Sequence, residues 1–469
     1  MSGERTLIRG ATVITMEPGA ADGPADILIE DDEILAIERE LVVGDGSARV
    51  VDASDHIAIP GFIDTHRHLY QILMRGLGSN WSLTQYLSTI IGSLGPSFTP
   101  EDLYVANRLG ALDAIDSGVT AVFDWCQQST SREHTDALLA ALESVTIRAT
   151  FGSGADIIDL QECLSPPFIS SRPTDADAVR RLRERYPSDT GLLTIGLAGR
   201  GPDHTTLQVV TDDQALAREL GIRLNMHHGA GVLPGGSSIK AMGEAGLLGD
   251  NLTIGHANHF SDDDVRLMAD HGVTVSVTPE DECNMGHGWP PINQMIAGGL
   301  WPNIGADTNL AVGSDFFTAM RFALAVPRAQ HNAAELAAGR NPWTLNLTAR
   351  DVLRMATVEG ARALGQESRI GSLAVGKQAD IVLIDTRHVS MMPVHDPVAA
   401  VVHHASRAVV SDVFVAGRQV KQHGQLVGVD TRKLHGEATE AAVGLVERAG
   451  VAPGWAPPPP GDAVHLMEA

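Results

Sequence analysis

Eight short apolar runs, each followed by a stretch of helical composition, constrain the fold of this sequence more than any other feature. Helical segments such as residues 100–117 and 131–142 separate the runs. Strands that alternate with helices form parallel sheets, and eight such units close into a (β/α)8 barrel. We therefore expect an α/β protein whose barrel spans residues 59–370. The runs occupy residues 57–63, 119–123, 147–151, 193–197, 222–226, 252–254, 273–277 and 302–305.

A doubly wound open sheet is the competing fold for the same alternation of strands and helices. That fold binds nucleotides through a glycine-rich phosphate turn after its first strand. No such turn follows Ile63, so the barrel is favoured.

Both ends of the chain consist of short strand-like segments and tight turns. They are residues 7–14, 26–29 and 34–37 before the barrel, and 379–384, 400–402 and 409–415 after it, with a hairpin turn at Gly417 and Arg418. Neither end has enough apolar surface to fold alone, so we expect the two to pack as one small β-sandwich. Residues 1–58 would form its N-terminal part. Residues 371–469 would form its C-terminal part and a tail, which the prolines at 457–460 should keep extended.

Composition excludes several kinds of partner. The chain has 34 Lys and Arg against 58 Asp and Glu, a formal charge of −24, whereas nucleic acids and anionic membranes attract basic surfaces. Its three cysteines, Cys126, Cys163 and Cys283, are too scattered for a disulfide framework or a cysteine zinc cluster. No apolar stretch is of signal-peptide or membrane-span length. We expect a cytoplasmic protein that acts on a small molecule.

Histidines and one aspartate stand where barrel strands end. His66 and His68 are two residues apart in an extended segment, so both side chains should face the barrel mouth. His227 closes the fifth run, His256 the sixth and Asp307 the eighth. Three imidazoles and a carboxylate, His66, His68, His227 and Asp307, would form a divalent-metal site with a position left for water, as catalytic zinc sites do.

The chain resembles the amidohydrolase superfamily, in its branch of triazine hydrolases and nucleobase or S-adenosylhomocysteine-type deaminases. The resemblance rests on PGFIDTHRH at 60–68, NMGHG at 284–288, ATVEGA at 356–361 and GSLAVGKQAD at 371–380. It extends over nearly the whole chain, and the last segment is the one that in this family returns the chain from barrel to sandwich. The resemblance implies a metal-dependent hydrolase that acts on carbon–nitrogen bonds other than peptide bonds.

The resemblance also implies roles for the residues at the strand ends. It makes His66, His68, His227 and Asp307 ligands of one divalent ion, with Zn2+ the best fit and Fe2+, Co2+ or Mn2+ as alternatives. His256 would contact the metal-bound water or the substrate. Members with two metals bridge them with a carboxylated lysine on the fourth strand, and residues 193–200 contain no lysine. The family is often oligomeric, so we expect a homo-oligomer.

One position departs from the deaminase pattern, which carries His-x-x-Glu on the fifth strand. The glutamate, which moves a proton to the leaving nitrogen, is replaced by Ala230 if His227 begins the motif and by Gly231 if His228 does. Another group must then supply that proton, or the leaving group needs none. The candidates are His228 beside the ligand and three residues of the seventh-strand loop: Glu280, Glu282 and His287. We expect His228 and Glu280 to join Asp307 and His256 as catalytic residues.

Substrate contacts are expected from the segments around the mouth. In the family, the stretch after the histidine pair forms part of the pocket wall, which here places Gln71 and Arg75 there. Trp81 would either stack on a ring or pack beneath its loop. Glu282 and His287 are further substrate candidates. The cysteines lack an activating histidine arrangement and are expected to be structural.

The expected reaction is attack by a metal-bound hydroxide, with Asp307 as base, on an electrophilic carbon of a small heterocyclic molecule. The bond broken would be an amide, cyclic amide, amidine or ring-amine C–N bond. The resemblance favours deamination of a nucleobase-like ring, whereas Ala230 favours a carbamate, thiocarbamate or halide leaving group. A non-enzymatic scaffold is disfavoured because all four ligand positions are filled, and a metal lyase would not need His256 to orient water.

Overall fold

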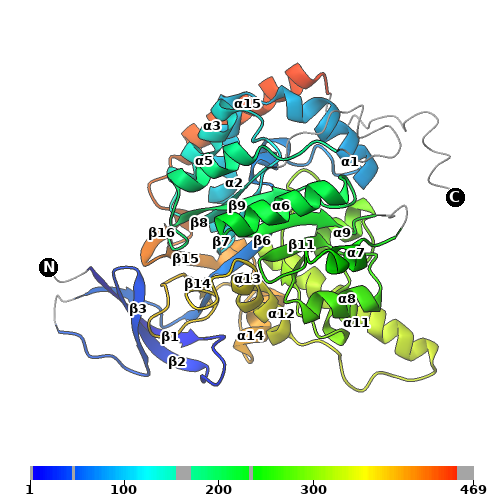
Figure 1. Ribbon diagram of the computed structural model, residues 1–469. Coiled ribbons are helices and arrows are strands. Elements are labelled where there is room, and N and C mark those ends of the chain that lie inside the picture. The colour runs from blue at the N-terminus through cyan, green and yellow to red at the C-terminus, as the bar shows by residue number, and fades with distance from the viewer. Residues whose placement is uncertain (1–3, 45–47, 155–170, 232–235, 452–469) are drawn as a thin grey trace.

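The computed structural model describes residues 4–44, 48–154, 171–231 and 236–451. Two sheets organise it, one at each side of Figure 1, with helices around the sheet at the right. The tail and Cys163 lie outside the described residues. This arrangement confirms the predicted fold class, an α/β barrel with a sheet domain built from both terminal segments.

Eight parallel strands form the barrel in chain order, and each pairs with the next. The sheet closes between its first and last strands through a bridge from Arg67 to Asp307. The Asp307 N–H donates to the His66 carbonyl at 2.9 Å, and the His68 N–H donates to the Asp307 carbonyl at 3.0 Å. The strands are β6 (Phe62–Arg67), β7 (Val119–Trp125), β8 (Arg148–Ser153), β9 (Leu193–Gly199), β10 (Leu224–His228), β11 (Leu252–His256), β12 (Thr274–Val277) and β13 (Asn303–Ile304).

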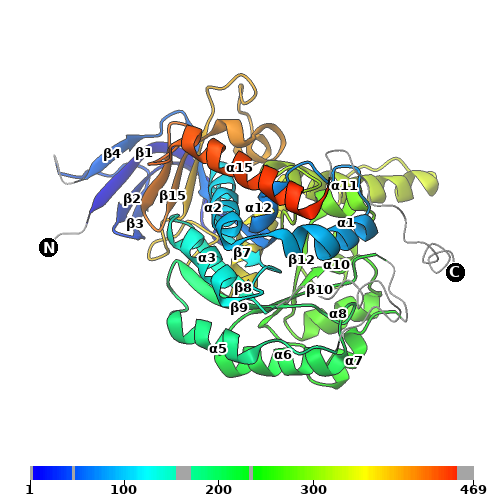
Figure 2. The ribbon, with the colours of Figure 1, turned by 90° about the horizontal axis from the view of Figure 1, so that it is seen from above.

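Helices cover the outside of the barrel, as Figures 1 and 2 show. The 3-10 helix η1 (Leu69–Met74) follows β6 directly. The α-helices are α1 (Leu83–Thr89), α2 (Pro100–Asp116), α3 (Arg132–Glu143), α5 (Ala176–Arg185), α6 (Leu207–Leu220), α7 (Ile239–Glu244), α8 (Asp262–Asp270), α9 (Pro279–Met285), α10 (Ile292–Ala297), α11 (Phe316–Ala337), α12 (Ala349–Ala356), α13 (Val358–Ala363), α14 (Pro397–Ala399) and α15 (Thr431–Ala449). The predicted helices at 100–117 and 131–142 correspond to α2 and α3.

The sheet at the left of Figure 1 interleaves strands from the two ends of the chain. β5 pairs with β14 over five residues and with β1 over two. Side chains from both ends, including Ile27, Ile381 and Phe414, share one buried cluster. Its strands are β1 (Arg5–Val13), β2 (Gly23–Glu30), β3 (Glu33–Glu38), β4 (Arg49–Asp52), β5 (His56–Pro60), β14 (Ile381–Asp385), β15 (Val410–Val415), β16 (Arg418–Gln422) and β17 (Gln425–Leu426).

Three details differ from the sequence prediction. The apolar run at 57–63 is split, because β5 belongs to the terminal sheet through Pro60 and β6 begins the barrel after Gly61. The strand predicted at 400–402 is wrong: these residues begin the π-helix η4 (Ala400–His404), where all three apolar side chains are buried. The helix α15 was not predicted, and it lies along α2 on the barrel (Figure 2) rather than on the terminal sheet.

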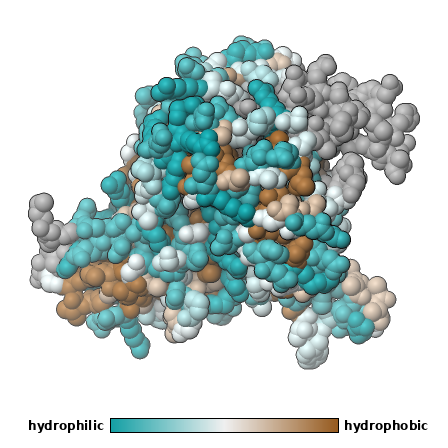
Figure 3. Space-filling view, in the orientation of Figure 1, coloured by the Kyte–Doolittle hydropathy of each residue, from teal (hydrophilic) through white to brown (hydrophobic). Residues whose placement is uncertain are grey.

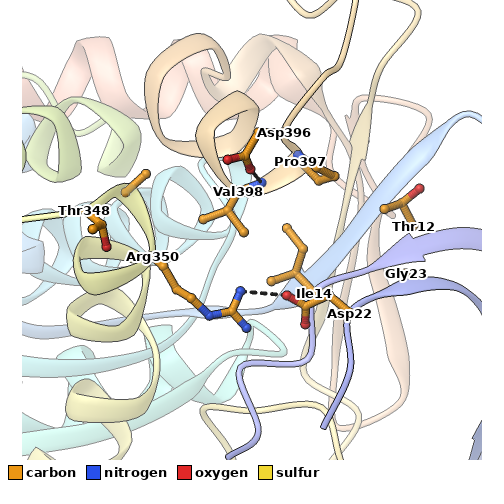
Figure 4. Close-up of a pocket in the computed structure, with 10 residues that line it drawn as sticks. Thr12, Ile14, Asp22, Gly23, Thr348, Arg350, Asp396, Pro397 and Val398 are labelled. Carbon is orange, nitrogen blue, oxygen red and sulfur yellow. Dashed lines mark hydrogen bonds and ion pairs between the residues drawn. The ribbon is translucent and has the colours of Figure 1, made fainter. Parts of the chain in front are cut away.

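A cleft of about 440 Å³ lies where the terminal sheet meets the barrel (Figure 4). An ion pair of 2.6 Å between Arg350 of α12 and Asp22 crosses it. The cleft contains none of the strand-end histidines. Its lining residues are Thr12, Ile14, Asp22, Gly23, Thr348, Ala349, Arg350, Asp396, Pro397 and Val398.

The outer surface is mostly hydrophilic in the view of Figure 3, with apolar patches over the terminal sheet and the barrel. Among the described residues, the helices are all too short or too polar to cross a membrane.

Candidate metal centre and active site

The histidine pair at the end of β6 lies inside the barrel and is almost completely buried. The two rings are 5.2 Å apart between centroids and nearly perpendicular. The Nδ1 of His68 donates to the Trp125 carbonyl at 2.6 Å, and the Nδ1 of His66 lies 3.4 Å from Asn225 Oδ1. Contacts of this kind hold each ring in one orientation and direct its Nε2 to the same space.

Two glycines make room for the buried His66 side chain. A Cβ on Gly305 would come within 2.7 Å of the His66 carbonyl oxygen, and one on Gly255 would lie 3.1 Å from the ring. The position of His66 therefore depends on β11 and on the residue after β13 as well as on β6.

His227, His256 and Asp307 join this pair from three other strand ends. Ring centroids of His66 and His227 are 4.6 Å apart, and those of His66 and His256 are 5.3 Å apart. The Oδ1 of Asp307 lies 3.3 Å from His68 Nε2 and 4.0 Å from His66 Nε2. Its Oδ2 lies 3.8 Å from His256 Nε2.

Asp307 and His256 both have left-handed backbones, with φ of 54° and 79°. Such conformations are uncommon outside glycine, and they concentrate at functional sites. Here they turn both side chains into the mouth just where their strands end.

The donors present suit a divalent metal ion. Ligand atoms of His66, His68 and Asp307 lie within 4.8 Å of one another, as do those of His66, His227 and His256. The Nε2 of His66 is buried without a hydrogen-bond partner, which is costly unless a ligand engages it. Imidazole nitrogens with a carboxylate are the donor set of catalytic zinc sites.

Burial and neighbouring charges set the protonation of these groups. Burial lowers the pKa of His66 to about 3 and holds that of His227 well below its ordinary value, so both rings are neutral and able to bind a metal. Burial works against ionisation of Asp307, but the hydrogen bond from His68 and the charge of His256 outweigh it and hold the pKa of Asp307 well below its usual range.

His256 is held from behind by the first turn of α9. Its Nδ1 lies 3.2 Å from Thr278 Oγ1 and 3.5 Å from Glu282 Oε1. The same Glu282 oxygen accepts from the Thr278 N–H at 2.9 Å. Burial lowers the pKa of His256, but Glu282 and Asp307 outweigh it, so the net shift is upward. Glu282 therefore contacts a histidine of the centre, a pairing that the sequence did not reveal.

His228 points away from this space. Its Nδ1 donates to Asp203 Oδ1 at 2.5 Å, and its Nε2 accepts from the Ser238 N–H at 3.3 Å. Asp203 also accepts from the Gly229 N–H at 2.7 Å. With both nitrogens engaged, the ring fixes the loop after β10.

Three predicted pocket residues are occupied by contacts within the protein. The amide of Gln71 donates to Tyr86 OH at 2.7 Å and accepts from Thr308 Oγ1. Arg75 is half exposed and pairs with Asp113 at 2.8 Å. Trp81 is buried in the main core, which is the packing alternative considered for it.

The two remaining candidates differ in their surroundings. Glu280 accepts from the Gly313 N–H at 3.5 Å, and burial raises its pKa to about 7. His287 is 3% exposed, and neither ring nitrogen has a hydrogen-bond partner. Its ring is 4.9 Å from that of His256, so it faces the centre.

Imidazoles and one carboxylate that converge at the C-terminal mouth of a (β/α)8 barrel are the arrangement found in metal-dependent hydrolases. The chain belongs to the amidohydrolase family, whose model matches residues 57–420. This confirms the resemblance on which the sequence interpretation depended.

Relatives of known activity match over almost their full length. The chain is 27% identical to a 5-methylthioadenosine/S-adenosylhomocysteine deaminase of Moorella thermoacetica, over 93% of this chain and 98% of the relative. It is 26% identical to a 5'-deoxyadenosine deaminase of Methanosarcina mazei, over 94% of this chain and 98% of that relative. A triazine hydrolase structure from Arthobacter aurescens superposes with a TM-score of 0.81 at 25% identity, covering 94% of this chain and 99% of that one.

Family and relatives together make this chain a metal-dependent hydrolase that acts on carbon–nitrogen bonds other than peptide bonds. The predicted enzyme class and reaction type are confirmed at that level.

Proposed function

We propose that this chain is a zinc-dependent aminohydrolase that replaces an exocyclic amino group of a small nitrogen heterocycle by oxygen. The observation that carries the proposal is the convergence of His66, His68 and Asp307 ligand atoms within 4.8 Å, with His66 Nε2 buried and unpaired. Relatives that match more than nine-tenths of the chain are named as deaminases, which supports ammonia as the leaving group.

His66, His68, His227 and Asp307 would hold the metal ion, and His256 would lie beside the reacting water. A divalent ion bound there supplies Lewis acidity, which brings the pKa of water toward about 7. Side chains of the protein would carry out the proton transfer and orient the reacting water.

Asp307 is the group best placed to take a proton from the attacking water. Its Oδ2 faces His256 and accepts from Thr278 Oγ1 at 3.3 Å, which fixes the carboxylate in one orientation. His256 is fixed in turn by Glu282 and Thr278, so its Nε2 faces Asp307 and can orient the water. A base and an orienting group pre-positioned in this way lower the cost of reaching the transition state.

A second candidate is displacement of a halide from the same kind of ring. Ala230 favours it, because a halide leaves as an anion and needs no proton. The likeness to the triazine hydrolase adds support.

Two measurements test the proposal. Elemental analysis of the purified protein is expected to give about one equivalent of zinc per chain. A hydrolysis screen of aminopurines, aminopyrimidines, amino- and chlorotriazines, amides and carbamates, scored separately for ammonia and chloride, is expected to give ammonia. A protein that stays metal-free after expression in supplemented medium would refute it, and release of chloride alone would favour the second candidate.

The homo-oligomeric state and the cytoplasmic location stay predictions. For the first, the end of α11 and the loop after it carry Leu336, Trp343 and Leu345, all half or more exposed. Covering exposed apolar side chains of this kind with a second copy of the chain would lower the free energy.

A further inference from the structure

The structure distinguishes among the four candidates for the missing proton carrier. Both nitrogens of His228 are engaged, by Asp203 and Ser238. Glu280 contacts Gly313 on the loop after β13. Glu282 Oε1 serves the Thr278 N–H and the far side of His256. Only His287 combines two unpaired ring nitrogens with a position at the centre.

His287 also lies next to the position that lacks its glutamate. The Gly231 N–H donates to the His287 carbonyl at 2.8 Å, so the chain just after Ala230 contacts the backbone of His287. A second donor, His259 Nε2, reaches the same carbonyl at 2.7 Å. The backbone is therefore held from two sides while neither imidazole nitrogen has a hydrogen-bond partner.

The side chain faces the reacting groups. Ligand atoms of His287, His256 and Asp307 all lie within 4.8 Å of one another. Both ring nitrogens of His287 are buried without a hydrogen-bond partner, so the ring can accept a hydrogen bond or a proton at one nitrogen and donate at the other. An unpaired buried imidazole is costly unless a substrate or water uses it.

We propose that His287 carries the proton from Asp307 to the leaving nitrogen, in place of the glutamate replaced by Ala230. This inference rests on the proposed function. The water oxygen bonds to the ring carbon, and one water proton passes to Asp307 and then to His287. The C–N bond breaks with its electron pair on nitrogen, which takes that proton and leaves as ammonia. The oxygen keeps the second water proton, so water and the ring amine give the hydroxyl ring and ammonia.

A pair of substrates separates this role from a structural one. Two rings identical except for an amino or a chloro group at the reacting carbon are compared in wild type and His287→Gln. Chloride leaves without a proton, so the variant should lose about 10²–10⁴-fold in kcat on the amino ring and less than about tenfold on the chloro ring. His271→Gln, on the exposed end of α8, is the matched control and should match wild type.

A double variant decides the question on the amino ring alone. Ala230→Glu in the His287→Gln background restores a proton carrier to the family position and should recover at least about tenfold of the lost kcat. Equal losses on both rings, no loss, or no recovery in the double variant would overturn the proposal.

Metal content is measured for every variant, because His287 could instead be a ligand of a second ion with His256 and Asp307. A fall in metal stoichiometry in His287→Gln would therefore overturn the proposal too. A wild-type protein that hydrolyses neither ring, or holds no metal, would overturn the proposed function itself, and wild-type data alone would show that.

Discussion

Asp113 of α2 joins β6, the strand that carries the histidine pair, to the C-terminal part of the chain. Its carboxylate lies 2.8 Å from each of three arginines: Arg67 between His66 and His68, Arg75 after η1, and Arg407 before β15. Arg67 is completely buried and Asp113 nearly so. We expect Asp113→Asn to lower the free energy of unfolding substantially, because it leaves a buried guanidinium short of negative charge.

The size of the expected loss in unfolding free energy depends on which ion pairs of Asp113 are buried. Removing one partner of a buried ion pair costs about 3–5 kcal/mol. Arg67 keeps Asp64 at 3.4 Å, which places the expected loss near the lower end, at about 3 kcal/mol. The pair with half-exposed Arg75 contributes less than about 1 kcal/mol, so Arg75→Gln is the matched control.

The same carboxylate gives the prediction a pH dependence. Burial would raise the pKa of Asp113, but Arg67, Arg407 and Arg75 outweigh it and hold that pKa well below its ordinary value. A carboxylate whose pKa is depressed in the folded state stabilises the fold at pH values above its unfolded pKa of about 3.9. This stabilisation is lost as the pH falls through the folded pKa. The difference between wild type and Asp113→Asn should therefore be full at pH 7 and shrink below about pH 4.

Urea unfolding followed by tryptophan fluorescence at pH 7 and at pH 3.5 measures these differences. A loss under about 1 kcal/mol at pH 7, or an equal loss in Arg75→Gln, would refute the assignment of the stabilisation to the buried Arg67 pair.

Three further outcomes are expected. Burial raises the pKa of Glu280 to about 7. The fold is therefore most stable at low pH, where Glu280 is protonated, and loses that stability as the pH rises to 8.5 and the buried carboxyl group ionises. Glu280→Gln should be more stable than wild type at pH 8.5 by about 1–3 kcal/mol, and no gain in urea unfolding would contradict this. Asp307→Asn should lower kcat at least about 100-fold and reduce bound metal, with an unchanged circular dichroism spectrum; full activity would show that another group activates the water. Trp343→Ser should weaken self-association in light scattering, because this side chain is 98% exposed, and an unchanged mass distribution would place any interface elsewhere.

Much of the fold was readable from the sequence because parallel strands buried on both faces are nearly continuous apolar runs. All eight predicted runs overlap a barrel strand. The error at 400–402 has the same origin, since three apolar residues in a row are also compatible with a buried helical turn. The amphipathic helix α15 was missed because its apolar positions are mostly alanine and valine, diluted by charged residues.

The centre could be predicted only in part. His66, His68, His256 and Asp307 stand at strand ends, and barrel geometry brings strand ends together whatever lies between them. The residues that contact these strand-end side chains could not be predicted in this way. Glu282 behind His256 and Asp203 beside His228 depend on how loops return to the mouth. Nor could the sequence show that Arg75, expected at the pocket wall, pairs with Asp113, 38 residues further on.

The interleaved terminal sheet has a consequence for biosynthesis. β5 finds most of its hydrogen bonds in β14, which leaves the ribosome roughly 320 residues later. At about 5–20 residues per second, that strand waits on the order of 15–60 s for its neighbour. Its unpaired N–H and C=O groups and its apolar side chains stay open to solvent and to other nascent chains throughout that interval, so chaperone dependence in this protein should concentrate on residues 56–60.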